Sequence, residues 1–559
     1  MSNLNLRNLR HPGDWPENFG AIPGNPAVDN SAALGAWLSY LIANNRMGEA
    51  AGSDYHMTTA VVRDYQAAKF GIVGKGSQQS RFVVNGNAGG IQLRSTARNG
   101  QATLEGFSAV ANGTGGVGFE CSQMEGGAAI WPSLIVNDVG SISGDWGGAE
   151  TKYFGTGMRF AGHFDAKLST VYAKGPGLFA SSAPGSIRYS GAIGVDLQGC
   201  YDLRADNVDV QNFNIGVSST VYTASIISAA AGGGTTRATI SNGPHPFTTG
   251  FRISIRGASI GGYNGEYYVT NNGSGSFDLW ADAARTVPVA FAGTFTATAS
   301  IESGPEAMTF GECNINSCRK GFVYKRNNSP EPTLWVTESH FNCIETNIEV
   351  DGAFLVTIGE NSFYNEARVL DWTGANAIIP RDIHLINAAE IVVTGNTYHS
   401  LNDVARQHPS RVHLDTYDNG IFTRSGDNGI FEDNICRAIG AANIANLRGG
   451  NRNWSLGPDT VSGTYTKDYE INNQWGNNNN VRQRDGLPIT DLNLPKIGSY
   501  WARFEIGATN TPVASAAGIV EIVTWNDNNI IQTAHLIAPN VNTYSRRFAS
   551  GVWSAWVQL

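Results

Sequence analysis

The sequence of 559 residues is poor in charge, and it has neither a basic excess nor a long apolar run. Charged residues make up 15% of it, and the formal net charge is −9. A phosphate-binding surface needs a basic excess, so we expect no nucleic-acid partner. No window reaches the roughly 20 apolar residues of a membrane-spanning helix, so we expect no membrane insertion. The opening residues MSNLNLRNLRHPGDW lack the apolar segment of a secretory signal.

Paired cysteines and metal-binding motifs are also missing. The six cysteines include no CxxC pair, and several lie in strand-like runs, which favours reduced thiols in a core and synthesis in a reducing cytosol. They are Cys121, Cys200, Cys313, Cys318, Cys343 and Cys436. His408 and His413 lack the Glu-x-x-His arrangement of a zinc helix, and no acidic loop matches a calcium site. We therefore predict neither a metal nor another cofactor.

One segment near the N-terminus has a helical pattern. Asn18 to Leu38 reads NFGAIPGNPAVDNSAALGAWL, in which Asn30 or Ser31 can accept hydrogen bonds from the first helical turn. The apolar residues at helical spacing are Ala33, Leu34, Trp37, Leu38 and Leu41. Because hundreds of residues of short strands follow, this helix is suited to cover the open end of a β-solenoid. We predict an N-terminal cap over residues 1–50.

The middle of the chain repeats one pattern: a strand, a glycine or acidic residue, a polar residue, and a second short strand. Copies begin at Met308, Leu334, Leu355 and Ile391, with a weaker copy at Gly429. Self-similarity at about 20–40 residues indicates a solenoid, whose two parts we place at 51–220 and 305–455. Asn361 and Asn396 occupy equivalent places, so we expect them to form an asparagine ladder inside a turn.

Two segments break the repeat. Residues 221–304 begin with the low-complexity run AAAGGGTT and continue with alternating strands and turns. They predict a small β-barrel that leaves and re-enters the solenoid on one loop. Residues 456–559 end in short alternating strands with aromatic ends and predict a C-terminal β domain. Trp553 and Trp556 there are expected to pack in a core rather than to contact a sugar.

Three of these segments resemble parts of known protein families. The cap, with its FGA run before an alanine-rich helix, resembles that of pectate-lyase-like right-handed β-helices. The insertion, with HPF, GFRISIRGA, NGEYYVT and FDLW, resembles a β module found in some phage tailspikes. The ending, with DLNLPKIGSY and YSRRFASGVWSAW, resembles the C-terminal knob of tail fibres and tailspikes. Together they resemble a bacteriophage tailspike.

This resemblance implies the fold class and the biological setting. The expected fold is all-β: a right-handed parallel β-helix with an N-terminal helical cap, an inserted small β-barrel and a C-terminal knob-like β domain. The expected assembly is a homotrimer in the phage virion, made in the host cytoplasm. Its partners would be a capsular or O-antigen polysaccharide of the bacterium and a phage baseplate or adaptor protein. The cap begins close to Met1, so we expect a short or missing virion-attachment domain.

The repeat alignment predicts a column of carboxylates. Glu312, Glu338 and Glu360 take equivalent positions on successive coils, which lie about 4.8 Å apart. Carboxylates at one or two such steps match the separations used by retaining and inverting glycosidases. We therefore predict Glu338 and Glu360 as acid and base or nucleophile, with Glu312 tuning or replacing one of them. Aromatic residues near the same coils could stack on sugar rings; these are Trp335, Tyr364 and Trp372.

Other interpretations of the same residues stay open. The glutamates could project from a turn into solvent without a catalytic role. Asp165 and Asp202, each after an aromatic residue, form a second candidate acidic pair. A polysaccharide lyase needs a base and a neutralising cation, for which His340 and Arg319 are candidates. A fibre that binds a glycan without cutting it is the third alternative.

Overall fold

The computed structural model describes residues 12–559 apart from 96–99, 124–132, 145–150, 178–179, 181–182, 241–246, 248, 251, 273–274, 291–292, 302–304, 327–330, 366–377, 379–380, 401–411, 416–426, 433–434, 438–444, 449–451, 457–459, 463–481, 484–487, 493–499, 527–528, 539–540 and 550–551. The chain divides into two compact units. The first is Met1–Gly352 with Asn365–Ile378, and the second is Ala353–Tyr364 with Ile379–Leu559. No helix among the described residues is long and apolar enough to cross a membrane.

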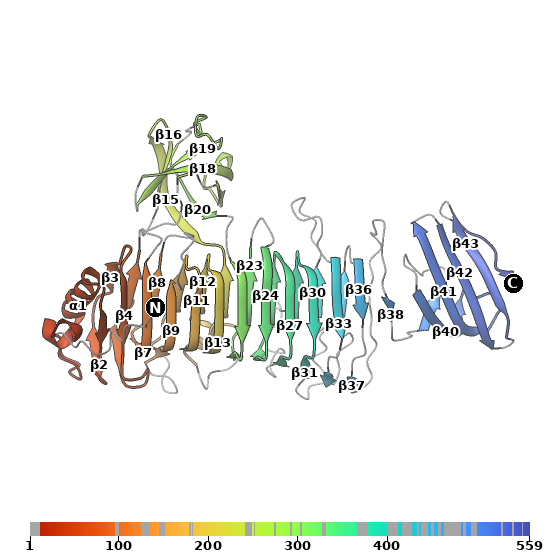
Figure 1. Cartoon of the computed structure of the whole chain (residues 1–559), viewed down its shortest axis with the longest axis horizontal. Coiled ribbons are helices and arrows are strands. Elements are labelled where there is room, and N and C mark those ends of the chain that lie inside the picture. The colour runs from red at the N-terminus through yellow and green to blue at the C-terminus, as the bar shows by residue number, and fades with distance from the viewer. Residues whose placement is uncertain are drawn as a thin grey trace, which may run out of the picture. The chain divides into compact units, whose positions relative to one another are not determined.

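The single long helix of the described residues, α1 (Ser31–Ala43), covers one end of the first unit (Figure 1). The short helical turns η2 (Pro12–Asp14) and η3 (Pro16–Phe19) pack against it. Leu34, Trp37 and Leu41 are completely buried, which confirms the predicted apolar stripe. The predicted capping by Asn30 is wrong, because its side chain accepts no bond from the first turn, whereas Asp29 Oδ1 accepts the Ser31 N–H at 3.0 Å. Asn30 Oδ1 instead accepts the Ile22 N–H at 2.7 Å and fastens the preceding loop.

The first unit is a stack of coils with parallel strands. The first strands of successive coils are β1 (Met47–Glu49), β4 (Lys69–Val73), β7 (Gln101–Asn112), β9 (Leu134–Ser143), β11 (Ala166–Lys174), β13 (Tyr201–Gln211), β21 (Glu306–Gly311) and β24 (Glu331–Thr337). Separate second strands are β2 (Asp54–Met57), β5 (Arg81–Asn85), β22 (Asn314–Asn316) and β25 (His340–Cys343). The long strands β7 and β13 pair with both kinds.

The other side of each coil is a second parallel sheet. Its strands, in the order of pairing, are β3 (Val61–Asp64), β6 (Ile91–Arg94), β8 (Val117–Ser122), β10 (Thr156–Ala161), β12 (Ile193–Gln198), β14 (Ile215–Thr220), β23 (Lys320–Lys325) and β26 (Thr346–Asp351). The turn η4 (Ile187–Tyr189) precedes β12. Strands that pair in parallel with their counterparts on the next coil define a parallel β-helix, as the sequence repeat predicts.

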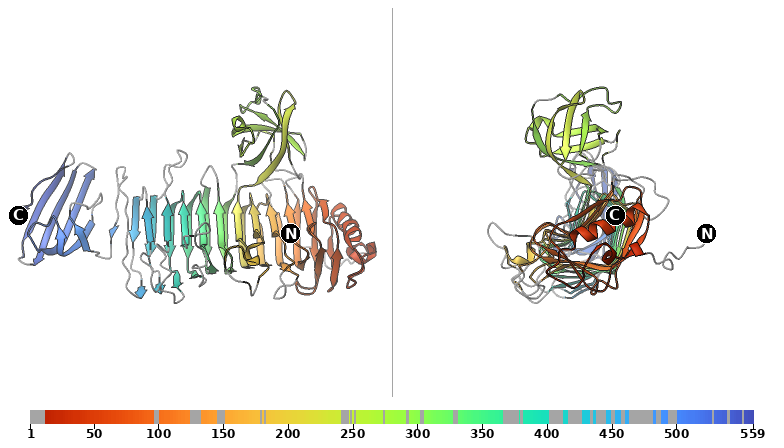
Figure 2. Two further views of the ribbon diagram at one scale, coloured as in Figure 1. Left: turned by 180° about the vertical axis from the view of Figure 1, so that it is seen from behind. Right: turned by 90° about the vertical axis from the view of Figure 1, so that its left-hand side faces the viewer.

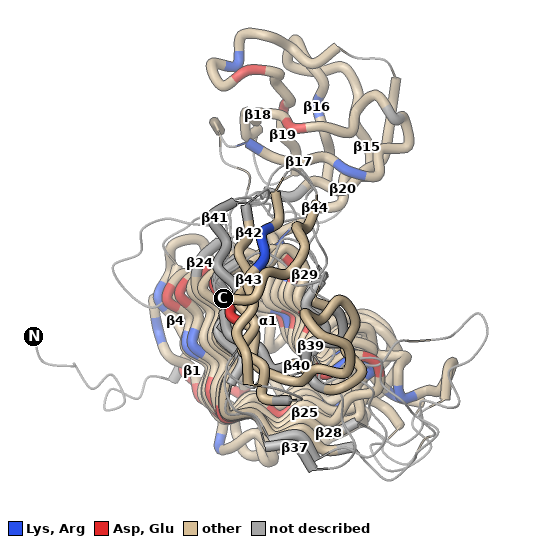
Figure 3. Tube along the Cα trace, turned by 90° about the vertical axis from the view of Figure 1, so that its right-hand side faces the viewer, with Lys and Arg blue, Asp and Glu red and all other residues tan. Residues whose placement is uncertain are grey.

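Aromatic side chains fill the inside of the coils. The rings of Phe82 and Phe107 lie 5.5 Å apart, and those of Phe107 and Phe119 lie 5.4 Å apart. Five cysteines are buried and free, which confirms the predicted core thiols for Cys121, Cys200, Cys313, Cys318 and Cys343. The view along the stack shows α1 across its end (Figure 2). Charged residues lie on the outside of the coils beside β4 and β24 (Figure 3).

A buried histidine makes the stability of the first unit depend on pH. His163 is completely buried, with Nε2 2.9 Å from the Cys121 carbonyl oxygen and Nδ1 3.1 Å from Ser133 Oγ. Burial lowers the pKa of His163 from 6.5 to about 4, so the folded chain holds it neutral. The unfolded chain gains a proton below about pH 6.5.

This stabilisation is therefore complete above pH 6.5, is lost as the pH falls toward 4, and amounts to about 3 kcal/mol. We expect the free energy of unfolding in urea to decrease over that window, and His163→Gln to show a flatter profile. Parallel pH profiles of the two proteins would contradict this assignment.

The inserted segment is a closed antiparallel barrel. Around the barrel, its strands are β15 (Thr223–Gly232), β16 (Thr235–Ile240), β19 (Ser276–Trp280), β18 (Gly265–Asn271), β17 (Arg252–Arg256) and β20 (Phe295–Ile301), with the turn η5 (Gly261–Tyr263) between β17 and β18. Its core centres on residues such as Phe247, Phe277 and Phe295. The barrel lies between β14 and β21, which confirms an insertion on one connection of the solenoid.

The second unit contains further coils. Its first strands are β27 (Ala353–Gly359), β30 (Ala389–Thr394), β33 (Asp427–Glu432) and β36 (Arg452–Leu456), and β38 (Arg482–Gln483) pairs with β36. Its second strands are β28 (Ser362–Asn365), β31 (Thr397–Ser400), β34 (Ile435–Arg437) and β37 (Thr460–Ser462). Its last strands are β29 (Arg381–Ile386), β32 (Val412–Asp415) and β35 (Ala445–Arg448). Asn396 Oδ1 accepts the Asn361 backbone N–H at 3.0 Å and its side-chain N–H at 3.1 Å. Both asparagines are buried, which confirms the predicted ladder.

The C-terminal strands form a separate sheet. They are β39 (Pro488–Asp491), β40 (Tyr500–Thr509), β41 (Ala517–Asn526), β42 (Asn529–Ala538), β43 (Thr543–Ala549), β44 (Val552–Trp553) and β45 (Val557–Gln558). Trp553 and Trp556 pack against the core of this sheet. The Arg546 guanidinium lies 4.2 and 4.3 Å from their ring centroids, so their role in packing agrees with the prediction.

Candidate functional site

The three predicted glutamates occupy the same turn of their coils, between a first and a second strand. Glu312 lies between β21 and β22, Glu338 between β24 and β25, and Glu360 between β27 and β28. Their φ angles are 51°, 52° and 57°, and all three side chains are exposed. Every one of these turns therefore uses a left-handed residue to change the direction of the chain. We call Glu312 and Glu338, which both belong to the first unit, the glutamate corner; Glu360 belongs to the second unit.

Glutamate is an unusual choice for this backbone conformation. Glycine, asparagine and aspartate tolerate it best, and the corresponding turns carry Asp138, Thr170, Asn207 and Gly395, of which only Thr170 falls outside that group. A left-handed conformation costs roughly 1–2 kcal/mol for a residue that has a side chain without a local hydrogen bond. Strained residues of this kind are concentrated at functional sites. Glutamate at these turns therefore costs conformational free energy that glycine or asparagine would avoid.

Strand register brings Glu312 and Glu338 side by side. Gly311 pairs with Thr337 and Asn314 pairs with His340, so Glu312 lies opposite Glu338 on adjacent parallel strands. Such strands are about 4.7–4.9 Å apart. This spacing is close to the roughly 5–5.5 Å between the two carboxyl groups of retaining glycosidases.

A third carboxylate lies beside this pair. A Cβ atom at Gly311 would lie 3.3 Å from Asp206 Oδ1, so the missing side chain gives room for this carboxylate next to Glu312. The sequence repeat does not reveal this neighbour of Glu312, because the whole inserted barrel separates β13 from β21. Asp206 is exposed.

A groove of about 350 Å³ adjoins the same row of turns. Thr170 and Asn207, which hold the corresponding left-handed positions on β11 and β13, line it together with Tyr172, Lys174 and Asp209. Lys174 forms an ion pair with Asp209, and burial lowers the pKa of Lys174. Asn314 donates to Asp209 at 3.4 Å. The groove supplies an aromatic ring and fixed polar groups, which are the elements of a sugar-binding surface.

The remaining predicted residues of this site lie in different surroundings. Trp335 is 43% exposed on the outer face of β24, three residues before Glu338, and is free to stack on a ligand. His340 lies on β25 beside Asn314 of β22. Arg319 binds Glu345 at 2.5 Å, so its charge is already paired. The Tyr364 ring stacks on His399 at 4.5 Å, which covers one of its faces. Trp372 lies outside the described residues.

The second acidic pair occupies the opposite end of the first strands. Asp165 and Asp202 lie at equivalent positions, because Lys167 pairs with Arg204. Both have left-handed φ angles, of 49° and 45°. The cations Lys167 and Arg204 follow on the same outer face and are exposed. The pair is therefore separate from the glutamate corner.

Among the described residues, no group of three or more His, Cys, Asp or Glu side chains is arranged to hold a metal ion.

No model of a protein family matches the sequence, and no curated protein matches it. Similar solved structures include the A-module of the mannuronan C-5 epimerase AlgE4 from Azotobacter vinelandii, with 10% identity over 84% of this chain and 99% of that chain and a TM-score of 0.48. The Dettilon tailspike protein has 11% identity over 97% of this chain and 84% of that chain, with a TM-score of 0.43. The gp42 tailspike of Acinetobacter phage vb_AbaP_AS12 has 11% identity over 99% of this chain and 83% of that chain, with a TM-score of 0.39. At these scores the similarity bears on neither the site nor the activity.

Proposed function

We propose that this chain is a phage tailspike depolymerase that hydrolyses glycosidic bonds of a bacterial capsular or O-antigen polysaccharide. The observation that carries the proposal is the glutamate corner: glutamate recurs at a left-handed turn that favours other residues, beside a groove lined by Tyr172, Lys174 and Asp209. In this proposal the chain works as a homotrimer held in the virion by a baseplate or adaptor protein.

The proposed chemistry uses Glu312 and Glu338 as the carboxyl pair. One protonates the leaving glycosidic oxygen, and the other attacks the anomeric carbon as a nucleophile, after which water releases the glycosyl group. Asp206 supports the pair electrostatically, and Glu360, in the second unit, stays a predicted catalytic residue. Trp335 and Tyr172 would stack on neighbouring sugar rings and hold the polymer along the corner.

A lyase is the second candidate, because Lys174 and Tyr172 line the groove next to the corner. Lysine and tyrosine can remove the proton next to a uronate carboxylate. Burial lowers the pKa of Lys174, which favours a base at this position, although the ion pair with Asp209 acts against this shift.

Product analysis distinguishes these activities. The full chain is incubated with a panel of capsular and O-antigen polysaccharides, and the products are measured by size and mass. We expect oligosaccharides with ordinary reducing ends and the mass of one added water. Products with an ultraviolet-absorbing unsaturated uronate would identify a lyase, and unchanged polymer bound to the protein would identify a non-cleaving adhesin. Either outcome would overturn the hydrolase proposal.

A further inference from the structure

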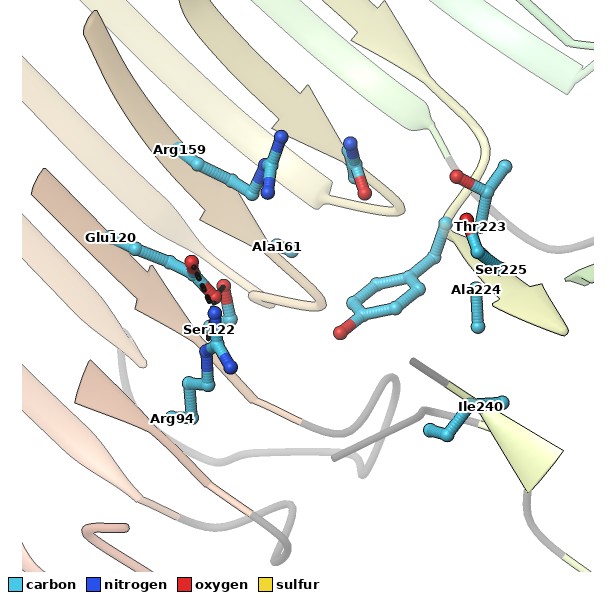
Figure 4. Close-up of a pocket in the computed structure, with 11 residues that line it drawn as sticks. Arg94, Glu120, Ser122, Arg159, Ala161, Thr223, Ala224, Ser225 and Ile240 are labelled. Carbon is cyan, nitrogen blue, oxygen red and sulfur yellow. Dashed lines mark hydrogen bonds and ion pairs between the residues drawn. The ribbon is translucent and has the colours of Figure 1, made fainter. Parts of the chain in front are cut away.

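A polar cavity of about 270 Å³ lies where the inserted barrel meets the coils (Figure 4). Arg94, Glu120 and Arg159 line it from β6, β8 and β10, while Thr223 and Ser225 line it from β15 of the barrel. Ala161 of β10 and Tyr222 belong to the same apolar cluster as the barrel core. The cavity is therefore built by two parts of the chain that are far apart in sequence.

Two ion pairs form the solenoid side of this cavity. Arg94 binds both carboxylate oxygens of Glu120, with distances of 2.8 and 3.1 Å. Arg159 donates through Nε to Asp196 Oδ2 at 2.9 Å, and Gln198 donates to the same oxygen at 2.8 Å. The carboxylates are nearly inaccessible, with 6% and 2% of their side chains exposed. Register places Glu120, Arg159 and Asp196 in one row across β8, β10 and β12.

Stability alone does not explain this row. Buried ion pairs pay a desolvation cost that often equals their attraction, and well-packed apolar residues would hold the strands as well. The pairs do fix the direction of every polar group. Arg159 uses Nε for Asp196, and Gln198 uses its amide N–H, so the terminal guanidinium nitrogens and the amide oxygen are held in place as a donor and an acceptor at the cavity.

The charge of the lining selects the kind of ligand. Arg94 and Glu120 line the cavity as one ion pair, and Arg159, which also lines it, is neutralised by Asp196 outside the lining, so the four charges sum to zero. Fixed donors, fixed acceptors and the Ser225 and Thr223 hydroxyls suit a ligand with many hydroxyl groups and no net charge. The volume lies just below the roughly 300–1,000 Å³ of pockets for drug-sized molecules, so the ligand is small.

We propose that this cavity is a recognition site for one or two neutral sugar residues of a glycan, bound jointly by the coils and the inserted barrel. The choice of a sugar among neutral polar ligands rests on the proposed function, but the binding itself requires no cleavage. The barrel then has a direct role, because it contributes one wall of the sugar site.

Two variants test the site in the full chain. Ser225→Trp fills the cavity from its exposed barrel side and leaves both ion pairs intact. Arg159→Met removes the fixed donor. Arg237→Met is the matched control, because Arg237 also donates through Nε to an aspartate, Asp278, but lies in the barrel outside the cavity. The probes are neutral and uronate-containing oligosaccharides made by chemical depolymerisation of the same polysaccharide panel, and binding is measured by calorimetry.

We expect at least one neutral oligosaccharide to bind, with an affinity at least tenfold lower in Ser225→Trp and Arg159→Met and unchanged in Arg237→Met. The inference is overturned if no neutral oligosaccharide binds, if Ser225→Trp binds as the parent does, or if only uronate-containing probes lose affinity. A chain that binds but cleaves nothing would leave this site standing and remove the hydrolase. If the parent chain cleaves the polysaccharide and Ser225→Trp binds oligosaccharides as the parent does, the hydrolase stands and this sugar site is removed.

Discussion

Replacing Glu338 by glutamine is expected to lower the rate of polysaccharide cleavage by at least about 100-fold, because glutamine keeps the shape of the side chain but neither donates a proton as an acid nor attacks as a carboxylate. Glu312→Gln should have a similar effect, since strand register places the two residues side by side. The Glu360→Gln variant tests whether the predicted residue of the second unit also takes part in cleavage. Cleavage is measured as the release of reducing ends from the polysaccharide identified in the panel.

The left-handed backbone at Glu338 also predicts a gain in stability that accompanies the loss of cleavage. Asparagine is well suited to φ angles near 52°, so Glu338→Asn should raise the free energy of unfolding by up to about 1 kcal/mol while it abolishes cleavage. A purely structural turn residue would gain stability without losing activity. The combination of a more stable and an inactive protein is typical of strain kept at a functional site.

Glu390→Gln is the control for these variants. Glu390 also has a left-handed φ angle, of 52°, but lies at the start of β30 rather than between a first and a second strand. Its replacement should leave cleavage unchanged. If Glu312→Gln, Glu338→Gln and Glu390→Gln all cleave like the parent, the glutamate corner has no catalytic role.

Truncation of the central aromatic stack is expected to have the largest effect on stability. Phe107 is completely buried, and its ring contacts Phe82 on one side and Phe119 on the other. Phe107→Ala should destabilise the surrounding coils by about 3–5 kcal/mol, because it removes buried apolar area and leaves a cavity that rigid parallel strands close poorly.

The loss should be local, because each coil of a solenoid contacts only its neighbours. Native-state hydrogen exchange should show faster opening of β5, β7 and β8, and little change in β40 to β42 of the C-terminal sheet. Val62→Ala provides the control, since Val62 on β3 is 43% exposed. Uniform loss of protection over the whole chain, or none near β7, would contradict this view of the core.

Sequence reasoning predicted the features that depend on a regular coil. The glutamates align because each comes directly after a first strand, and Asn361 and Asn396 align because each comes one residue later. The repeat therefore fixes the position of both sets. The cap stripe was also predictable, because helical periodicity alone identifies its buried face. The cap hydrogen bonds were not, since Asn30 has a competing partner in the loop at Ile22.

Residues that meet through irregular connections could not be predicted. Asp206 and Glu312 are neighbours only because β13 and β21 pair across the inserted barrel. Glu120, Arg159 and Asp196 form one row, but loops of unequal length separate them in the sequence. Conversely, Arg319 is the type of residue that could neutralise a substrate carboxylate, but its side chain pairs with Glu345 instead. That pairing follows from a strand register that the sequence does not reveal. The only sequence signal for the row of Glu120, Arg159 and Asp196 was the sign of the charge, which alternates from β8 to β10 to β12.

The central claim is that the polymer is cut at the glutamate corner. A crystal structure of Glu338→Gln with an oligosaccharide of its own polysaccharide tests it most directly. The account predicts sugar rings along the corner and into the groove of Tyr172 and Lys174, with a glycosidic oxygen within hydrogen-bond reach of residue 312 or 338. An oligosaccharide seated at Asp165 and Asp202, with the corner left in solvent, would contradict it.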